Sequence, residues 1–164
     1  MSAVGDFNYD LVQFQTLLST STVFQDWVGV DSSDAALPFI ILWAVDLTPE
    51  DAPEKFVLLY IGPMSLRVTR VAMKGDHFSL EPNFVASFQE KVDESLSVED
   101  QCISIVNAAG NVMADIRSLS GVDGAYSVQE YENVPNDPML PSEAEGSNGY
   151  SEFAVMITGR KRTL

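Results

Sequence analysis

Apolar residues near the start of the chain recur every three or four positions. They are Leu11, Phe14, Leu17 and Leu18. This spacing predicts an amphipathic helix over residues 9–19 with one buried face. A second short helix should follow, because Ser21 or Thr22 can cap its start and Gly29 can end it.

Five short segments further along the chain have the composition of strands. They cover residues 39–45, 56–61, 66–73, 78–80 and 84–89. The first is an unbroken apolar run, which predicts a central strand buried on both faces, whereas the last alternates and predicts a strand with one solvated face. A phase shift between Val68 and Val71 indicates a bulge, and Gly75 with Asp76 is the predicted turn after it. A meander is the simplest connection of these strands.

The clearest predicted element is a long helix that begins after Ser97 and runs to Gly121. Ser97 and Asp100 resemble a capping box, with a shorter acid than usual at its last position. Nine apolar residues step by three or four and should lie on the sheet. They are Val98, Cys102, Ile105, Val106, Ala109, Val112, Met113, Ile116 and Leu119. Gly110 in mid-helix is unfavourable by about 1 kcal/mol relative to alanine, so we expect close backbone packing there.

The last third of the chain predicts two strands separated by a long loop. Residues 126–131 and 152–157 alternate, and they most simply form an antiparallel pair. Residues 133–149 contain three prolines and no periodic apolar pattern, so we expect a mobile loop. The order of elements predicts an α+β fold, with a mostly antiparallel sheet, one long helix packed on it and one or more N-terminal helices.

Length and composition fit one folded domain over residues 1–164. Of the 164 residues, 46% are hydrophobic and 20% are charged, which supplies enough apolar material for a core. Nine basic residues oppose 24 acidic ones, and the net charge of −15 disfavours direct binding to nucleic acid. No apolar run reaches the roughly 18 residues of a membrane span, and the N-terminal sequence lacks the layout of a signal peptide. We therefore expect no membrane association.

Residue types that commonly carry catalysis are scarce. His77 follows a turn sequence without a nucleophile motif, so a turn residue is favoured over a general base. Cys102 is on the apolar face of the long helix, which predicts a buried core thiol. Trp27 and Trp43 lie in apolar runs and are interpreted as core residues. Because the acidic loops lack calcium-loop spacing and no nucleotide motif occurs, we predict no catalytic, cofactor-binding or metal-binding residues.

Charge is unevenly distributed along the chain. Residues 160–164 form a basic C-terminal tail on an otherwise acidic protein. This tail either promotes head-to-tail self-association or is a frayed, solubilising end. We expect the loop over 133–149 to become ordered only against a neighbouring subunit. The candidate partner contacts are Asp137, Glu143, Glu145, Arg160, Lys161 and Arg162.

Stretches spread over most of the chain carry a resemblance to a known family. They are Leu17-Leu18-Ser19, Phe24-Gln25-Asp26-Trp27, Asp34-Ala35-Ala36, residues 107–116, Leu119-Ser120-Gly121, Gly124-Ala125-Tyr126-Ser127-Val128, Tyr150 and Phe153-Ala154-Val155. In this pattern the chain resembles the small tail-terminator and tail-completion proteins of long-tailed bacteriophages and prophages. The resemblance implies a non-enzymatic virion protein, assembled in the host cytoplasm, that forms a ring, often six-fold. Such rings cap the tail tube and contact other tail proteins or the head connector.

A second class of protein is similar in size, charge and order of elements: acidic α+β chaperones of secreted effectors, which dimerise and bind an unfolded client on apolar patches. Against this interpretation, the chain shows no third terminal helix, and its apolar faces are assigned to one core. A ring or concentration-dependent oligomer would favour the first interpretation, and a compact dimer the second. The third interpretation is an enzyme of unknown type.

Overall fold

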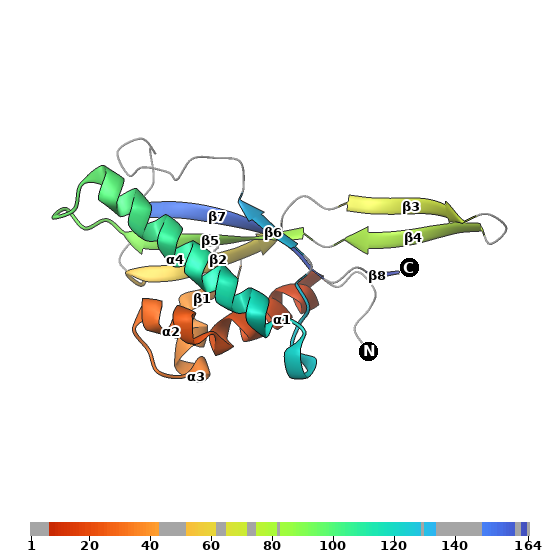
Figure 1. Ribbon diagram of the computed structural model, residues 1–164, viewed down its shortest axis with the longest axis horizontal. Helices are drawn as coiled ribbons and strands as arrows, with labels where there is room; N and C mark the ends of the chain where they lie inside the picture. Colours follow the sequence, from red (N-terminus) through yellow and green to blue (C-terminus); the bar gives the residue numbers. More distant parts are fainter. Residues whose placement is uncertain are drawn as a thin grey trace.

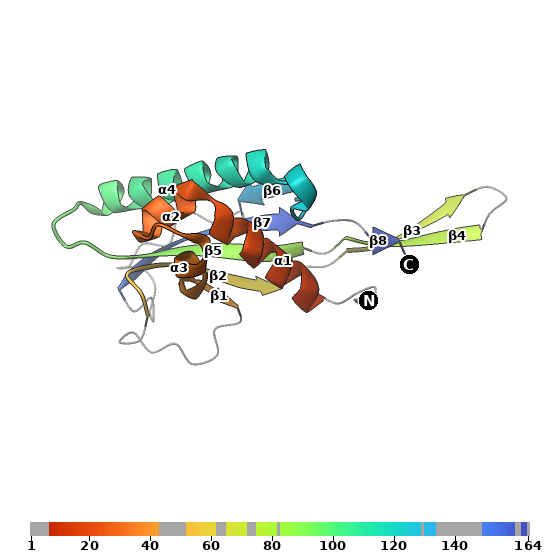
Figure 2. The ribbon, with the colours of Figure 1, turned by 90° about the horizontal axis from the view of Figure 1, so that it is seen from below.

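A five-stranded mixed sheet forms the centre of the fold, in agreement with the predicted α+β class. The computed structural model describes residues 7–42, 52–61, 65–71, 75–81, 83–128, 130–133, 149–159 and 162–163. Within these ranges, the backbone alone is described for residues 7–9, 61–81, 123, 130–133 and 162–163. The strands of the sheet are β1 (Ile40–Leu42), β2 (Lys55–Ile61), β5 (Asn83–Lys91), β6 (Glu130–Asn133) and β7 (Tyr150–Thr158). Their order is β1-β2-β5-β7-β6, in which β1 is parallel to β2 and the other pairs are antiparallel. One face is covered by the helices α1 (Phe7–Thr20), α2 (Thr22–Val28) and α4 (Val98–Leu119) (Figure 1, Figure 2).

The two N-terminal helices form where the sequence predicts them. α1 covers the predicted residues and buries its apolar positions in the core. Ser21 caps α2, because its hydroxyl accepts the Phe24 N–H at 3.2 Å. The same hydroxyl donates to the Asp115 carboxylate of α4 at 2.6 Å. Gly29 ends α2 with a φ of 83°, a left-handed conformation that favours glycine. Ser21 therefore both caps α2 and joins it to α4.

Most of the predicted core-facing positions of α4 are buried or pack on the core, but Val98, Cys102 and Gly110 differ from the prediction. Ser97 caps the helix by accepting the Asp100 N–H at 3.1 Å. Val98 is 50% exposed and Cys102 is only half-buried, because the first turns of α4 extend past the end of the sheet (Figure 1). Gly110 is exposed, and a Cβ atom there would meet nothing within 4 Å. The expected close packing at Gly110 is therefore wrong, since this residue lies on the solvent face of the helix.

The first predicted strand begins one residue later than predicted, and its position in the sheet is wrong. After the short helix α3 (Ser33–Ala36), Leu37–Phe39 form a 3₁₀ turn, and Ile40–Leu42 are the residues of the predicted strand that the structure describes as paired. Pro38 has no N–H to donate and fits this turn better than a paired strand. β1 is an edge strand of the described sheet rather than a central one. Trp43 and the rest of the predicted strand lie outside the described residues.

β5 is the central strand, and both of its faces are covered. On the helix side, the Phe84 ring packs edge-on against Phe14 of α1, with 5.0 Å between ring centroids. On the opposite side, Val85 and Ser87 are also buried. The Ser87 hydroxyl donates to the Glu152 carboxylate of the adjacent strand β7 at 2.6 Å. The predicted solvated face is therefore wrong, because polar side chains of neighbouring strand positions cover it.

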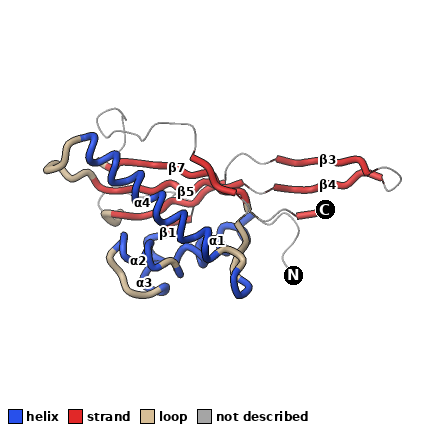
Figure 3. Tube along the Cα trace, in the orientation of Figure 1, coloured by secondary structure: helices blue, strands red, loops and turns tan. Residues whose placement is uncertain are grey.

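A hairpin of β3 (Ser65–Val71) and β4 (Gly75–Glu81) is inserted between β2 and β5, so the predicted meander is wrong. Residues are paired without interruption from Ser65 opposite Glu81 to Val71 opposite Gly75. These residues therefore contain no bulge, and Gly75 and Asp76 belong to a strand rather than a turn. β8 (Arg162–Thr163) adds antiparallel to β4. We call β3, β4 and β8 the arm, which projects beyond the five-stranded sheet and its helices (Figure 2, Figure 3).

The segment after α4 enters the sheet later than predicted. The turn η2 (Val122–Gly124) follows the helix, and pairing as a strand begins only at Glu130. Side chains from the end of α4 hold the intervening backbone. Ser120 Oγ accepts the Val128 N–H at 2.7 Å, and Arg117 Nη1 donates to the Val128 carbonyl at 2.8 Å. β6 then pairs antiparallel with β7, as predicted.

Candidate functional site

The predicted partner contacts are placed only in part. Asp137, Glu143, Glu145, Arg160 and Lys161 lie outside the described residues, as does most of the loop predicted over 133–149. Arg162 lies in β8, opposite Leu80 of β4. The interpretation of the basic segment as a frayed tail is therefore wrong at Arg162, because backbone pairing joins this residue to the arm.

The single histidine and the single cysteine lie in other surroundings than predicted. His77 is a residue of strand β4 and not of a turn. Cys102 is half-buried on α4 rather than enclosed in the core. Trp27, by contrast, packs on the core as expected, with its ring centroid 6.0 Å from that of Phe24 and 5.7 Å from that of Phe88. Its Nε1 atom is buried without a hydrogen-bond partner.

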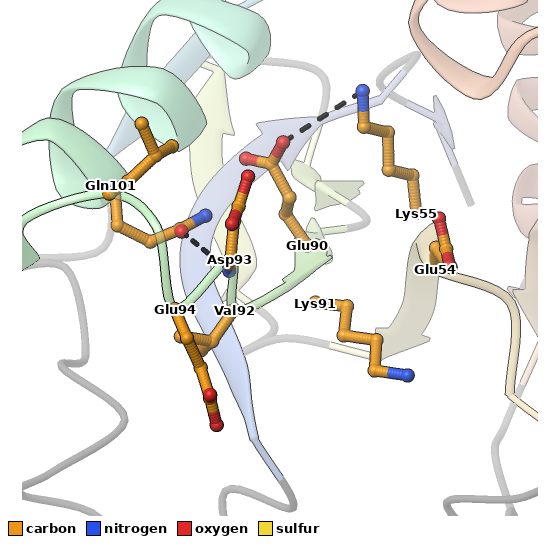
Figure 4. Close-up of a pocket in the computed structure, with 9 residues that line it drawn as sticks. Glu54, Lys55, Glu90, Lys91, Val92, Asp93, Glu94 and Gln101 are labelled. Atoms are coloured by element: carbon orange, nitrogen blue, oxygen red, sulfur yellow. Dashed lines mark hydrogen bonds and ion pairs between the residues drawn. The ribbon is translucent and has the colours of Figure 1, made fainter.

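A polar groove of about 450 Å³ lies at the end of the sheet where β2 begins and β5 ends. It is lined by Glu54, Lys55, Glu90, Lys91, Val92, Asp93, Glu94, Leu96 and Gln101 (Figure 4). This set contains four carboxylates and two ammonium groups, and we call the groove the acidic groove. The antiparallel pairing of β2 with β5 brings its two sides together, and the turn from β5 into α4 closes it.

The floor of the acidic groove is a hydrogen-bonded structure. Glu90 is mostly buried, and its carboxylate lies 3.8 Å from Lys55 Nζ and accepts the Ser104 hydroxyl at 3.2 Å. Gln101 Oε1 accepts the Asp93 N–H at 2.9 Å (Figure 4). These contacts join the end of β5 to β2 and to the first turns of α4. The buried groups of the floor are therefore engaged within the chain, and the rim is the part that can meet a partner.

The rim of the acidic groove carries exposed carboxylates. Glu54, Asp93 and Glu94 are all exposed. Asp93 Oδ1 accepts the Ser95 hydroxyl at 2.6 Å and the Ser95 N–H at 2.9 Å. These two hydrogen bonds, the hydroxyl first, hold the pKa of Asp93 below its ordinary value, because they favour the ionised form. Leu96, beside the carboxylates, is 44% exposed. The rim thus combines negative charge with a small apolar surface.

This arrangement suits the binding of a cationic and partly apolar group. Exposed carboxylates attract lysine and arginine side chains, and an ionised acceptor forms shorter and stronger hydrogen bonds than a neutral one. Among the side chains that the structure describes, no three from histidine, cysteine, aspartate and glutamate are grouped so as to hold a metal ion. Within the same described part of the chain, no helix is long and apolar enough to cross a bilayer.

Sequence reasoning identified the acid at position 54 but not the groove. Glu54 belongs to an acidic stretch of the sequence with Glu50 and Asp51, whereas no motif marks Asp93 and Glu94. The two sets meet only because β2 pairs with β5 across the inserted hairpin. Periodicity shows that a segment is a strand but not which strand it pairs with, so the groove has no signal in the sequence pattern.

Comparison with known proteins adds no assignment to this geometry: the chain matches no protein-family model, and a search of curated proteins gives no match.

Proposed function

We propose that the protein is a non-enzymatic structural protein of a bacteriophage virion, which forms a ring that terminates the tail tube and joins it to the head connector. The proposal places it in the virion, after assembly in the host cytoplasm, with further copies of itself and other tail or connector proteins as partners. Support comes from the sequence resemblance to tail-terminator and tail-completion proteins and from the shape of the chain.

The projecting arm is the observation that carries the proposal. Of the described elements, β3 makes its extensive contacts with β4, and β4 makes its own with β3 and β8. Because β8 has only two residues, the arm is close to a two-stranded hairpin, which in isolation is at best marginally stable in water. A neighbouring subunit in a ring supplies a surface that can pack on it.

The pairing of the arm indicates which face needs a cover. Leu66 lies opposite Leu80, and Val68 lies opposite Phe78. Because successive strand residues alternate between the two faces of a sheet, these four residues share one face. A hairpin with one apolar face must bury that face against another element to be stable. This requirement favours an assembly over a monomer.

The oligomeric state and the location in the virion test the proposal. Sedimentation velocity and electron microscopy of the purified protein over a range of concentrations should detect a closed ring. Antibody labelling of virions should place the protein at the junction of head and tail. A compact dimer at all concentrations, together with binding of an unfolded client, would contradict the proposal and favour the secretion-chaperone class.

A further inference from the structure

The basic residues of the chain are concentrated in and around the arm. Six of the nine lie in residues 62–82 and 160–164, the two segments that contain the arm. They are Arg67, Arg70, Lys74, Arg160, Lys161 and Arg162. Only two acids, Asp76 and Glu81, lie in the same two segments, so the rest of the chain has three basic residues against 22 acidic ones. The two sequence segments that contain the arm are therefore basic, and the rest of the chain is strongly acidic.

The strand register places part of this charge on the apolar face of the arm. Arg162 is paired with Leu80, so the two residues share the face that also contains Val68. Arg70 lies on the same face by alternation, nearer the far end of the hairpin. The face thus combines apolar residues with Arg162 at the end near the body and, at the far end, Arg70 paired opposite Asp76. A matching surface needs exposed apolar groups and carboxylates next to one another.

The acidic groove has these properties and lies at the opposite end of the body. β2 and β5 are antiparallel, with Lys55 paired with Glu90 at one end and Ile61 paired with Phe84 at the other. The groove is at the first end, and the arm leaves from the second (Figure 1). Leu96, exposed at the groove, supplies the apolar contact. A basic arm at one end and an acidic receptor at the other are the two halves of a head-to-tail contact.

We infer that the arm of one copy docks on the acidic groove of the next copy, with arginines of the arm paired to the rim carboxylates. This inference rests on the proposed ring, because a repeated head-to-tail contact closes into a ring when its rotation allows. The occupant is a second copy of the chain rather than nucleic acid, since the acidic body repels a phosphate backbone and attracts the arm.

Two charge variants and their mixture test the contact. The arm variant is Arg70→Gln and Arg162→Gln, and the groove variant is Asp93→Asn and Glu94→Gln. Each alone should associate at least about tenfold more weakly than the wild type, because close charge pairs across an interface are strongly coupled. The equimolar mixture should form dimers and nothing larger, since one intact arm meets one intact groove and no second pair remains. Light scattering after gel filtration measures each state.

A matched control has the same change of charge elsewhere on the body. Asp31 and Asp34 are exposed, lie in the α2–α3 region and are not among the residues that line the groove. The variant Asp31→Asn with Asp34→Asn should assemble like the wild type. Circular dichroism and melting of every variant as a dilute sample confirm that the fold is kept, so that a loss of assembly reports on the contact.

Each outcome separates this inference from the proposed function. If both charge variants form wild-type rings, the arm–groove contact is wrong and the ring proposal stands. If the variants lose association and their mixture gives dimers, but the wild type forms open filaments that are absent from virions, the contact is right and the proposed function is wrong. If the wild type binds duplex DNA at physiological salt through the arm, with self-association unchanged in the arm variant, the inference is overturned in favour of a nucleic-acid partner.

Discussion

Replacement of Gly110 by alanine should stabilise the protein. The residue lies in the interior of α4, a helix of 22 residues, and its place on the helix faces solvent. An added Cβ atom would meet nothing within 4 Å, so the substitution introduces no clash. What remains is the difference in helix propensity, which favours alanine by about 0.8–1 kcal/mol because glycine loses more backbone entropy on folding. For a chain of this size we expect the melting temperature to rise by roughly 2–4 °C.

Urea unfolding followed by far-ultraviolet circular dichroism measures this effect on a dilute sample. The unfolding midpoint should rise while the slope of free energy against urea is unchanged, because the surface exposed on unfolding stays the same. Ala114→Gly is the matched control, since Ala114 is exposed one turn later on the same helix and should lose a similar free energy. The double variant should unfold close to the wild type. A lower midpoint for Gly110→Ala would refute the reasoning and would mean that a surface packs on Gly110.

Three further predictions concern the core, a helix cap and the acidic groove. Ile105→Asp should unfold the domain, because Ile105 is fully buried and an unpaired buried carboxylate is unfavourable by several kcal/mol against a total stability of about 5–15 kcal/mol. The control Ile103→Asp, at a position that is 50% exposed, should fold normally by circular dichroism. Ser21→Ala should lower the free energy of unfolding by about 1–2 kcal/mol in urea titrations, since it removes the cap of α2 and a hydrogen bond to α4. Ser95→Ala should raise the pKa of Asp93 towards its ordinary value, as measured by carboxyl-carbon NMR. In the wild type this lowered pKa stabilises the folded state at neutral pH, and the stabilisation is lost as the pH falls through the pKa of Asp93 in the folded state. An unchanged Asp93 titration in the variant would contradict the assigned cause.

Local elements of the fold were predictable because local chemistry determines them. The caps at Ser21 and Ser97 and the end of α2 at Gly29 follow from the hydrogen-bonding and conformational properties of single residues. The core-facing stripe of α4 follows from helical periodicity, and the α+β class follows from the order of the elements. These predictions need no knowledge of which segments meet in space.

The errors arise where the answer depends on long-range pairing. Ile40–Leu42 form an edge strand because, among the described strands, β1 pairs with β2 alone, and no apolar count at 39–45 reveals this. The alternation at 84–89 is typical of a strand with one solvated face, yet Ser87 is buried because β5 lies between β2 and β7. Gly75 has the composition of a turn, but it pairs with Val71 in the arm. The acidic groove shares this cause, since it exists only once β2 and β5 are side by side.

The inner position of β7 has a consequence for synthesis of the chain. β7 lies between β5 and β6, although residues 150–158 are translated long after residues 83–91. A nascent chain that has made β2, β5 and α4 therefore has a central strand with one side of its backbone unpaired. Unpaired strand edges recruit other chains and promote aggregation, and contacts that are distant in sequence form slowly. A ribosome that stalls before residue 150 should leave a product that needs chaperones, so expression at reduced temperature should favour the correctly folded protein.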